Sequence, residues 1–122
     1  MHVAADTALV RNLRDMTVML MARGGKDLTA RQLAVFLTCY LRDDAQTVQG
    51  LAVALRDRKP AITRALNRLG DLGLIRRGPD LGDRCRPVQR TAKGAVLLLD
   101  LECRMAKFAA IRPLDEQLSW PI

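Results

Sequence analysis

Basic side chains gather in one third of this sequence. Residues 56 to 93 contain nine arginines and two lysines but only four acids, while the nine other cations of the chain are matched by nine acids. This window therefore holds the whole net charge of +7. The guanidinium of arginine is a planar fork that suits phosphates and guanine edges. The composition favours a polyanion-binding surface, and the alternative is a solvated face without a ligand.

Side chains for catalysis or metal binding are scarce. The chain has one histidine, His2, and one serine, Ser119, so a histidine-dependent nucleophile is not expected. Its three cysteines are odd in number, and their spacing fits neither a disulfide framework nor a common zinc motif. We therefore expect no enzyme, no metal site and no cofactor.

The cysteines differ in their neighbours. Cys85 stands between Arg84 and Arg86, and nearby cations lower a thiol pKa and favour the reactive thiolate. This makes Cys85 a candidate redox switch, with an incidental surface thiol as the alternative. Cys39 and Cys103 have apolar neighbours on predicted helices, so we expect both to pack in the core.

The chain shows no membrane or secretion signal. Its longest apolar stretch, around Val96 to Leu99, is far shorter than the ~20 residues of a membrane helix, and the N-terminus lacks the pattern of a signal peptide. With 122 residues and 49% apolar residues, the sequence predicts one cytoplasmic domain over 1–122 with a packed core.

Apolar periodicity and capping residues predict the helices that precede the basic hairpin. A stripe of apolar residues places the first helix over 6–22. Thr29 and Gln32 form the capping box of a second helix that ends at 42–44. Thr47 caps a third over 48–55. A fourth runs from Pro60 to about residue 72, with a buried stripe of Ile62, Ala65, Leu66 and Leu69.

A short hairpin and a long helix complete the predicted order. Residues 74–77 and 88–90 favour two strands, separated by a turn-forming segment rich in glycine, proline and aspartate. Thr91 caps a last helix over 92–112, which Pro113 is expected to end.

The third and fourth helices form a helix-turn-helix pattern, whose second helix enters the major groove. Arg58 and Lys59 lie where this helix begins, although the helix dipole disfavours cations there. A bound phosphate would resolve this conflict, and the alternative is that both side chains point into water. Charge and position also make Asn67, Arg68, Arg77, Arg84 and Arg86 candidate DNA contacts.

Five segments of the sequence together resemble the MarR family of bacterial winged-helix regulators. They are LTARQLAVF from Leu28, TVQGLAVAL from Thr47, KPAITRALNRLGDLGLIRRGPD from Lys59, DR at Asp83–Arg84 and TAKG at Thr91–Gly94. The sequence departs from the family pattern in the hairpin. Cys85 replaces a second arginine, the segment before Thr91 is one residue shorter, and Arg90 replaces leucine.

The resemblance implies a fold and a set of contacts. The fold is mainly α (α+β): a winged helix-turn-helix core over 28–91 with a short β-hairpin wing, dimerised through the N- and C-terminal helices over 6–22 and 92–112. Lys59, Pro60, Thr63 and Arg64 would lie at the major groove. Arg84 would reach toward the minor groove, and Asp83 would brace the wing.

These observations predict a sequence-specific, double-stranded DNA-binding transcriptional repressor that acts as a homodimer on a pseudo-palindromic site. The alternative is a winged-helix module that binds a protein or binds DNA without sequence preference. The resemblance also implies a small-molecule effector, to which Arg14 and Tyr40 could contribute, although either could be purely structural.

Overall fold

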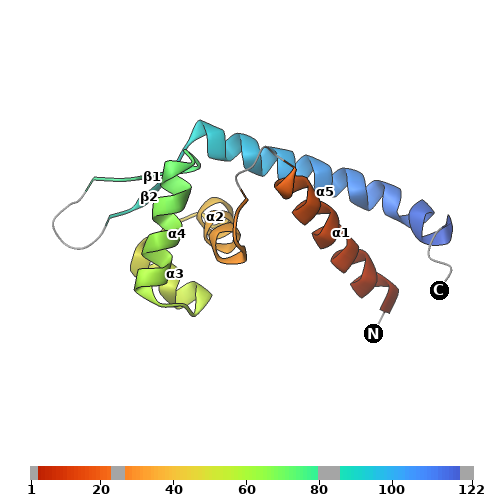
Figure 1. Ribbon diagram of the computed structural model, residues 1–122, viewed down its shortest axis with the longest axis horizontal. Helices are drawn as coiled ribbons and strands as arrows, with labels where there is room; N and C mark the ends of the chain where they lie inside the picture. Colours follow the sequence, from red (N-terminus) through yellow and green to blue (C-terminus); the bar gives the residue numbers. More distant parts are fainter. Residues whose placement is uncertain (1–2, 23–26, 80–85, 119–122) are drawn as a thin grey trace. The chain divides into compact units, whose positions relative to one another are not determined.

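The computed structural model describes residues 3–22, 27–79 and 86–118. Its elements follow the predicted order of four helices, a hairpin and a last helix (Figure 1). They are α1 (Val3–Met21), α2 (Ala30–Leu41), α3 (Val48–Leu55), α4 (Lys59–Asp71), β1 (Ile75–Arg77), β2 (Val88–Arg90) and α5 (Ala92–Leu118). The chain divides into two compact units, residues 28–98 and residues 1–27 with 99–122. We call them the winged-helix unit and the terminal unit.

Local sequence signals set the helix starts in the winged-helix unit. The predicted capping box of α2 is present, with the Thr29 hydroxyl accepting from the Gln32 N–H and the Gln32 side chain accepting from the Thr29 N–H. The Thr47 hydroxyl likewise accepts from the Gly50 N–H at the start of α3. Each bond satisfies a backbone group that the first helical turn leaves free.

The core of this unit forms where α2, α3 and α4 meet. The predicted α4 stripe is confirmed, because Ile62, Ala65, Leu66 and Leu69 are all buried. Phe36 and Leu51 contribute fully buried side chains from α2 and α3. Large apolar side chains from three helices therefore close a core within 28–98.

The strands form the predicted antiparallel hairpin. Ile75 pairs with Arg90 and Arg77 with Val88 in its register. The N–H of Val88 also donates to the carbonyl of Gln46, between α2 and α3, over 2.8 Å. The base of the hairpin is thus bonded to the helical core as well as to itself.

The TAKG segment connects the hairpin to α5. The Thr91 hydroxyl accepts from the N–H of Gly94, which confirms the predicted cap. The buried Tyr40 hydroxyl donates to the Leu74 carbonyl over 2.6 Å and accepts from the Thr91 N–H. A Cβ atom at Gly94 would lie 1.8 Å from this hydroxyl oxygen, so only glycine fits there. The tyrosine, the threonine and the glycine therefore act as one structural joint.

The terminal unit consists of α1 and the part of α5 from residue 99. Met16 and Leu101 are buried, but the apolar stripe of α1 is largely in solvent. Leu9 and Leu13 have exposed fractions of 66% and 64%. The structure shows no helix among the described residues that is both long and apolar enough to span a bilayer.

Two expectations about α5 are wrong. The helix does not end at Arg112 but continues through Pro113 to Leu118. A proline removes one backbone donor and crowds the preceding turn, at a cost of about 3 kcal/mol, yet later residues can resume the helical bonding. Cys103 is exposed rather than packed in the core, because it lies two positions from the buried Leu101 and so about 200° around the helix.

Candidate nucleic-acid interface

A three-residue turn joins α3 to α4. Arg56 closes α3 in the left-handed region, at φ 53°, and is the one described residue other than glycine with a positive φ. The N–H of Asp57 then donates to the Ala52 carbonyl over 3.0 Å. Arg58 follows in extended conformation as the N-cap of α4. The tight turn confirms the helix-turn-helix pattern predicted from the sequence.

The two faces of α4 differ sharply. The side facing α2 and α3 is apolar and buried, whereas the candidate contacts lie on or beside the free face. Thr63 is half-buried, and the others are exposed: Arg58, Lys59, Pro60, Arg64, Asn67 and Arg68. The structure therefore gathers all seven predicted α4 contacts along one helix. Arg68 also lies in the last helical turn, where a cation is favoured by the helix dipole without any ligand.

The N-terminus of α4 lacks the side-chain cap found on α2 and α3. The Arg58 side chain does not bond the first turn, Pro60 has no backbone N–H, and the first turn contains no acidic residue. The exposed cations Arg58 and Lys59 lie beside the N–H groups of Lys59 and Ala61, which have no partner within the helix, whereas the Arg58 N–H is bonded to Asp57. This combination can accommodate an anion such as a phosphate.

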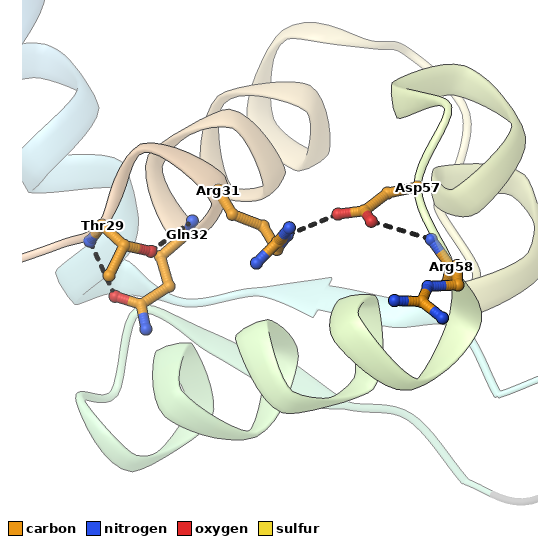
Figure 2. Close-up of polar contacts among 5 residues, drawn as sticks. All are labelled: Thr29, Arg31, Gln32, Asp57 and Arg58. Atoms are coloured by element: carbon orange, nitrogen blue, oxygen red, sulfur yellow. Dashed lines mark hydrogen bonds and ion pairs between the residues drawn. The ribbon is translucent and has the colours of Figure 1, made fainter.

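One carboxylate connects the turn to α2. Asp57 accepts a hydrogen bond from the backbone N–H of Arg58 over 2.8 Å and forms an ion pair with the Nε of Arg31 (Figure 2). The Arg58 N–H and then the Arg31 guanidinium lower the pKa of Asp57, so it is ionised at neutral pH. Neither Arg31 nor Asp57 was among the candidates from the sequence. The available signal was Arg31 itself, a cation in the first turn of a helix, where the dipole disfavours it.

The hairpin presents its cations differently from α4. Arg77 is half-buried, and its Nε has no hydrogen-bond partner within the described part of the chain. Burial, and then the charge of Arg86, lower the pKa of Arg77. Arg86 is exposed, but its Nε donates to the Gly78 carbonyl over 3.0 Å. A terminal nitrogen of Arg77 donates to the Arg86 carbonyl over 3.4 Å, so both guanidinium groups bond backbone carbonyls of the hairpin. Asp83, Arg84 and Cys85 lie outside the described residues.

Arg90 is a further residue whose role the sequence did not predict. Its Nε donates to the Cys39 carbonyl and its terminal nitrogen to the Arg42 carbonyl, over 3.1 and 2.6 Å. Its guanidinium also lies 5.6 Å from the centre of the Tyr40 ring. These carbonyls are at the C-terminal end of α2, where a cation is favourable. Arg90 therefore attaches β2 to α2, and this contact explains an arginine at a position next to the core.

The similarity of the chain to known proteins agrees with this geometry. A model of the MarR family matches residues 26–84, which include α2, α3, α4 and β1. The match spans just under half of the chain, and over this part the chain is similar to the MarR family. The match covers the helix-turn-helix and the first strand of the wing, so the MarR-family likeness lies where the candidate contacts lie. No curated protein sequence matches the chain significantly.

Solved MarR-family structures share the fold over nearly the whole chain. MepR, a transcription regulator of the Staphylococcus aureus multidrug efflux pump MepA, is 20% identical, with a TM-score of 0.70 over 98% of this chain and 86% of that one. MarR is 25% identical, with a TM-score of 0.60 over 96% and 85%. A MarR-like transcriptional regulator from Thermotoga maritima is 20% identical, with a TM-score of 0.64 over 98% and 84%. The chain thus has the winged-helix fold and is similar to DNA-binding transcription regulators of this kind.

Proposed function

We propose that this chain is a MarR-like transcriptional repressor that binds one double-stranded DNA sequence specifically as a homodimer. The observation that carries the proposal is α4, whose buried apolar face fixes the helix and whose free face is basic. A rigid helix that offers arginine and asparagine side chains suits the edges of guanine and adenine in the major groove. Repression would follow from occupancy of the operator. A bacterial chain that binds genomic DNA would lie in the cytoplasm.

The N-terminus of α4 supports a fixed docking orientation. Arg58 and Lys59 lie beside the N–H groups of the first turn, which can hold a DNA phosphate, while the exposed Arg64 lies about one and a half turns further along the helix. Phosphate contacts set the register of a protein on DNA, and contacts to base edges supply the sequence preference. We therefore assign Arg58 and Lys59 to the backbone and Arg64 to a base edge. For the hairpin, we keep Arg84 as the wing contact and Asp83 as its brace.

Exposed apolar side chains support a homodimer. Helix α1 exposes Leu9, Val10, Leu13, Val18 and Met21, and α5 exposes Val96, Leu99 and Met105. A monomer would leave this apolar surface in water, and a second copy would cover it. A twofold dimer presents two α4 helices to DNA, so the operator should be pseudo-palindromic, with half-sites roughly 34 Å apart.

We also propose that a small molecule regulates the chain. Tyr40 has its hydroxyl bonded to the Leu74 carbonyl and the Thr91 N–H, so it is a structural residue. Arg14 is exposed and forms an ion pair with Asp15. We therefore infer that any effector relies on other side chains than the Tyr40 hydroxyl.

The test is to compare Arg64→Ala with Arg14→Ala. The wild-type chain would select a duplex from a random library, and a shuffled duplex of the same composition would serve as nonspecific DNA. Wild type should prefer the selected duplex by at least about a thousandfold. Both variants lose one exposed cation, but only Arg64→Ala should weaken the preference, by roughly tenfold or more.

Three results would contradict parts of the proposal. Equal losses of Arg64→Ala on both duplexes would limit Arg64 to a phosphate contact. A wild-type chain that selects no sequence would favour the alternative, a module that binds DNA nonspecifically or binds a protein. A reporter driven from the selected site that is not repressed by the chain would exclude the repressor role.

A further inference from the structure

Asp57 is an acid within the basic surface proposed to bind DNA. Its carboxylate accepts from the Arg58 N–H, at the N-cap of α4, and pairs with Arg31 in the first turn of α2 (Figure 2). One side chain therefore links α2 to the start of the recognition helix. We call Asp57 with these two partners the Asp57 clamp.

The start of α4 depends on this clamp more than the starts of α2 and α3 do. Thr29 and Thr47 cap those helices with their own hydroxyls, whereas Arg58 gives α4 no side-chain cap. The preceding Arg56 also occupies the left-handed region, which L-residues disfavour. The Asp57 carboxylate is the polar side chain that holds this turn, because it bonds both the N-cap backbone and a neighbouring helix.

Charge by itself makes the opposite prediction for Asp57. A carboxylate beside a DNA-binding surface repels phosphates, so its removal should tighten binding to any DNA. Removal of Arg31 should weaken binding to any DNA for the same reason. Removal of Asp57 should therefore weaken binding to the specific sequence if Asp57 positions α4, and should tighten it if only charge matters.

We propose that Asp57 and Arg31 are positioning residues for sequence recognition by α4, a proposal that rests on the DNA-binding function above. The clamp sets the angle at which α4 leaves the turn. That angle decides whether Arg64 meets a base edge, while nonspecific contacts to phosphates tolerate a change of angle.

The experiment compares Asp57→Ala and Arg31→Gln on the selected and the shuffled duplex. These variants change the net charge in opposite directions. The ratio of specific to nonspecific affinity should fall in both, by roughly fivefold for the loss of one surface ion pair. Nonspecific affinity should rise for Asp57→Ala and fall for Arg31→Gln. The double variant should lose little more than either single variant, because the clamp is one unit.

The controls separate the clamp from folding and from net charge. Asp71→Ala removes an exposed acid at the other end of α4 and should leave the ratio unchanged. Asp57→Asn keeps an acceptor for the Arg58 N–H but not the charge that pairs with Arg31, so its ratio should be intermediate. Thermal unfolding of each variant checks that the core persists. If Asp57→Ala does not fold, Asp57→Asn and Arg31→Gln carry the test.

Two results would overturn the clamp. One is an unchanged ratio in Arg31→Gln and in each folded Asp57 variant. The other is a parallel loss on both duplexes, which would indicate a general structural role. A wild-type chain that selects no DNA sequence overturns the proposed function itself, and thus is distinguishable from failure of the clamp alone.

Discussion

The winged-helix unit and the terminal unit use their apolar side chains differently. In the winged-helix unit, the stripe of α4 meets α2 and α3, and Ile62, Leu66 and Leu69 have no exposed surface. In the terminal unit, a stripe of the same helical period leaves Leu9 and Leu13 about two-thirds exposed. Identical spacing therefore predicts an amphipathic helix in both places, but it does not say what covers the apolar face.

The difference indicates which unit can bury its apolar side chains without a second copy of the chain. The winged-helix unit closes its core with residues 28–98, so its stability should depend on that core alone. The terminal unit exposes apolar area that a second copy would bury, so its stability should depend on protein concentration.

The largest effect is expected from Leu66→Ala in the centre of α4. Leu66 is completely buried, so the change deletes apolar contacts and leaves a cavity. The free energy of unfolding should fall by about 2–5 kcal/mol. Denaturant unfolding at two protein concentrations should give the same loss at both. A loss that disappears at high concentration would show that the winged-helix unit also relies on a partner.

Alkylation of the cysteines compares the packing of the two units directly. Burial raises the pKa of Cys39 from 9.0 to about 11, so its thiol is neutral at pH 8, while Cys103 is exposed. In a Cys85→Ser background, iodoacetamide should modify Cys39 at least roughly a hundredfold more slowly than an ordinary thiol, from its thiolate fraction alone.

Ionisation of Cys39 makes the free energy of unfolding depend on pH. The pKa of Cys39 is higher in the folded chain than in the unfolded chain, so the neutral thiol favours folding below pH 9.0 and this contribution is lost as the pH rises toward about 11. Mass spectrometry after a timed pulse of iodoacetamide would measure the modification of Cys39 and of Cys103. Fast native modification of Cys39 at pH 8 would contradict the closed core.

Most of the fold could be predicted because its signals are local. The caps at Thr29, Thr47 and Thr91 and the buried stripe of α4 depend on residues within one or two turns. The hairpin strands were also placed within one residue of their observed ends. The signals agree with the tertiary structure, so local reasoning was sufficient there.

The remaining features depend on contacts between distant residues. Arg31 pairs with Asp57 across 26 positions, and Arg90 reaches the Cys39 carbonyl across 51. A charge count includes such residues in a general basic surface, since it carries no information about their partners. Arg77 shows the same limit, because its charge and position predicted a DNA contact but not that the hairpin half-buries its side chain.

A pair of leucines with equal exposure tests the dimer. Leu13 in α1 and Leu41 in α2 are each 64% exposed, so Leu13→Asp and Leu41→Asp introduce the same charge at similar sites. If a second copy covers α1, the dimer dissociation constant should rise at least about tenfold for Leu13→Asp, from the lost burial of one leucine. Leu41→Asp should leave it unchanged. Sedimentation velocity over a concentration series measures both, and equal behaviour would place the interface elsewhere.

The smallest effect is expected at the turn that introduces α4. Arg56 has φ 53°, a conformation that costs an L-residue about 1 kcal/mol and that glycine adopts freely. Arg56→Gly should therefore be more stable than Arg56→Ala by about 1 kcal/mol, since both variants lose the same charge. Denaturant unfolding would measure the difference. Because the strain lies within the winged-helix unit, the gain should be the same at every protein concentration. A gain that grows with concentration would mean that this turn also senses the partner, and the contrast between the two units would then be weaker than their exposed surfaces indicate.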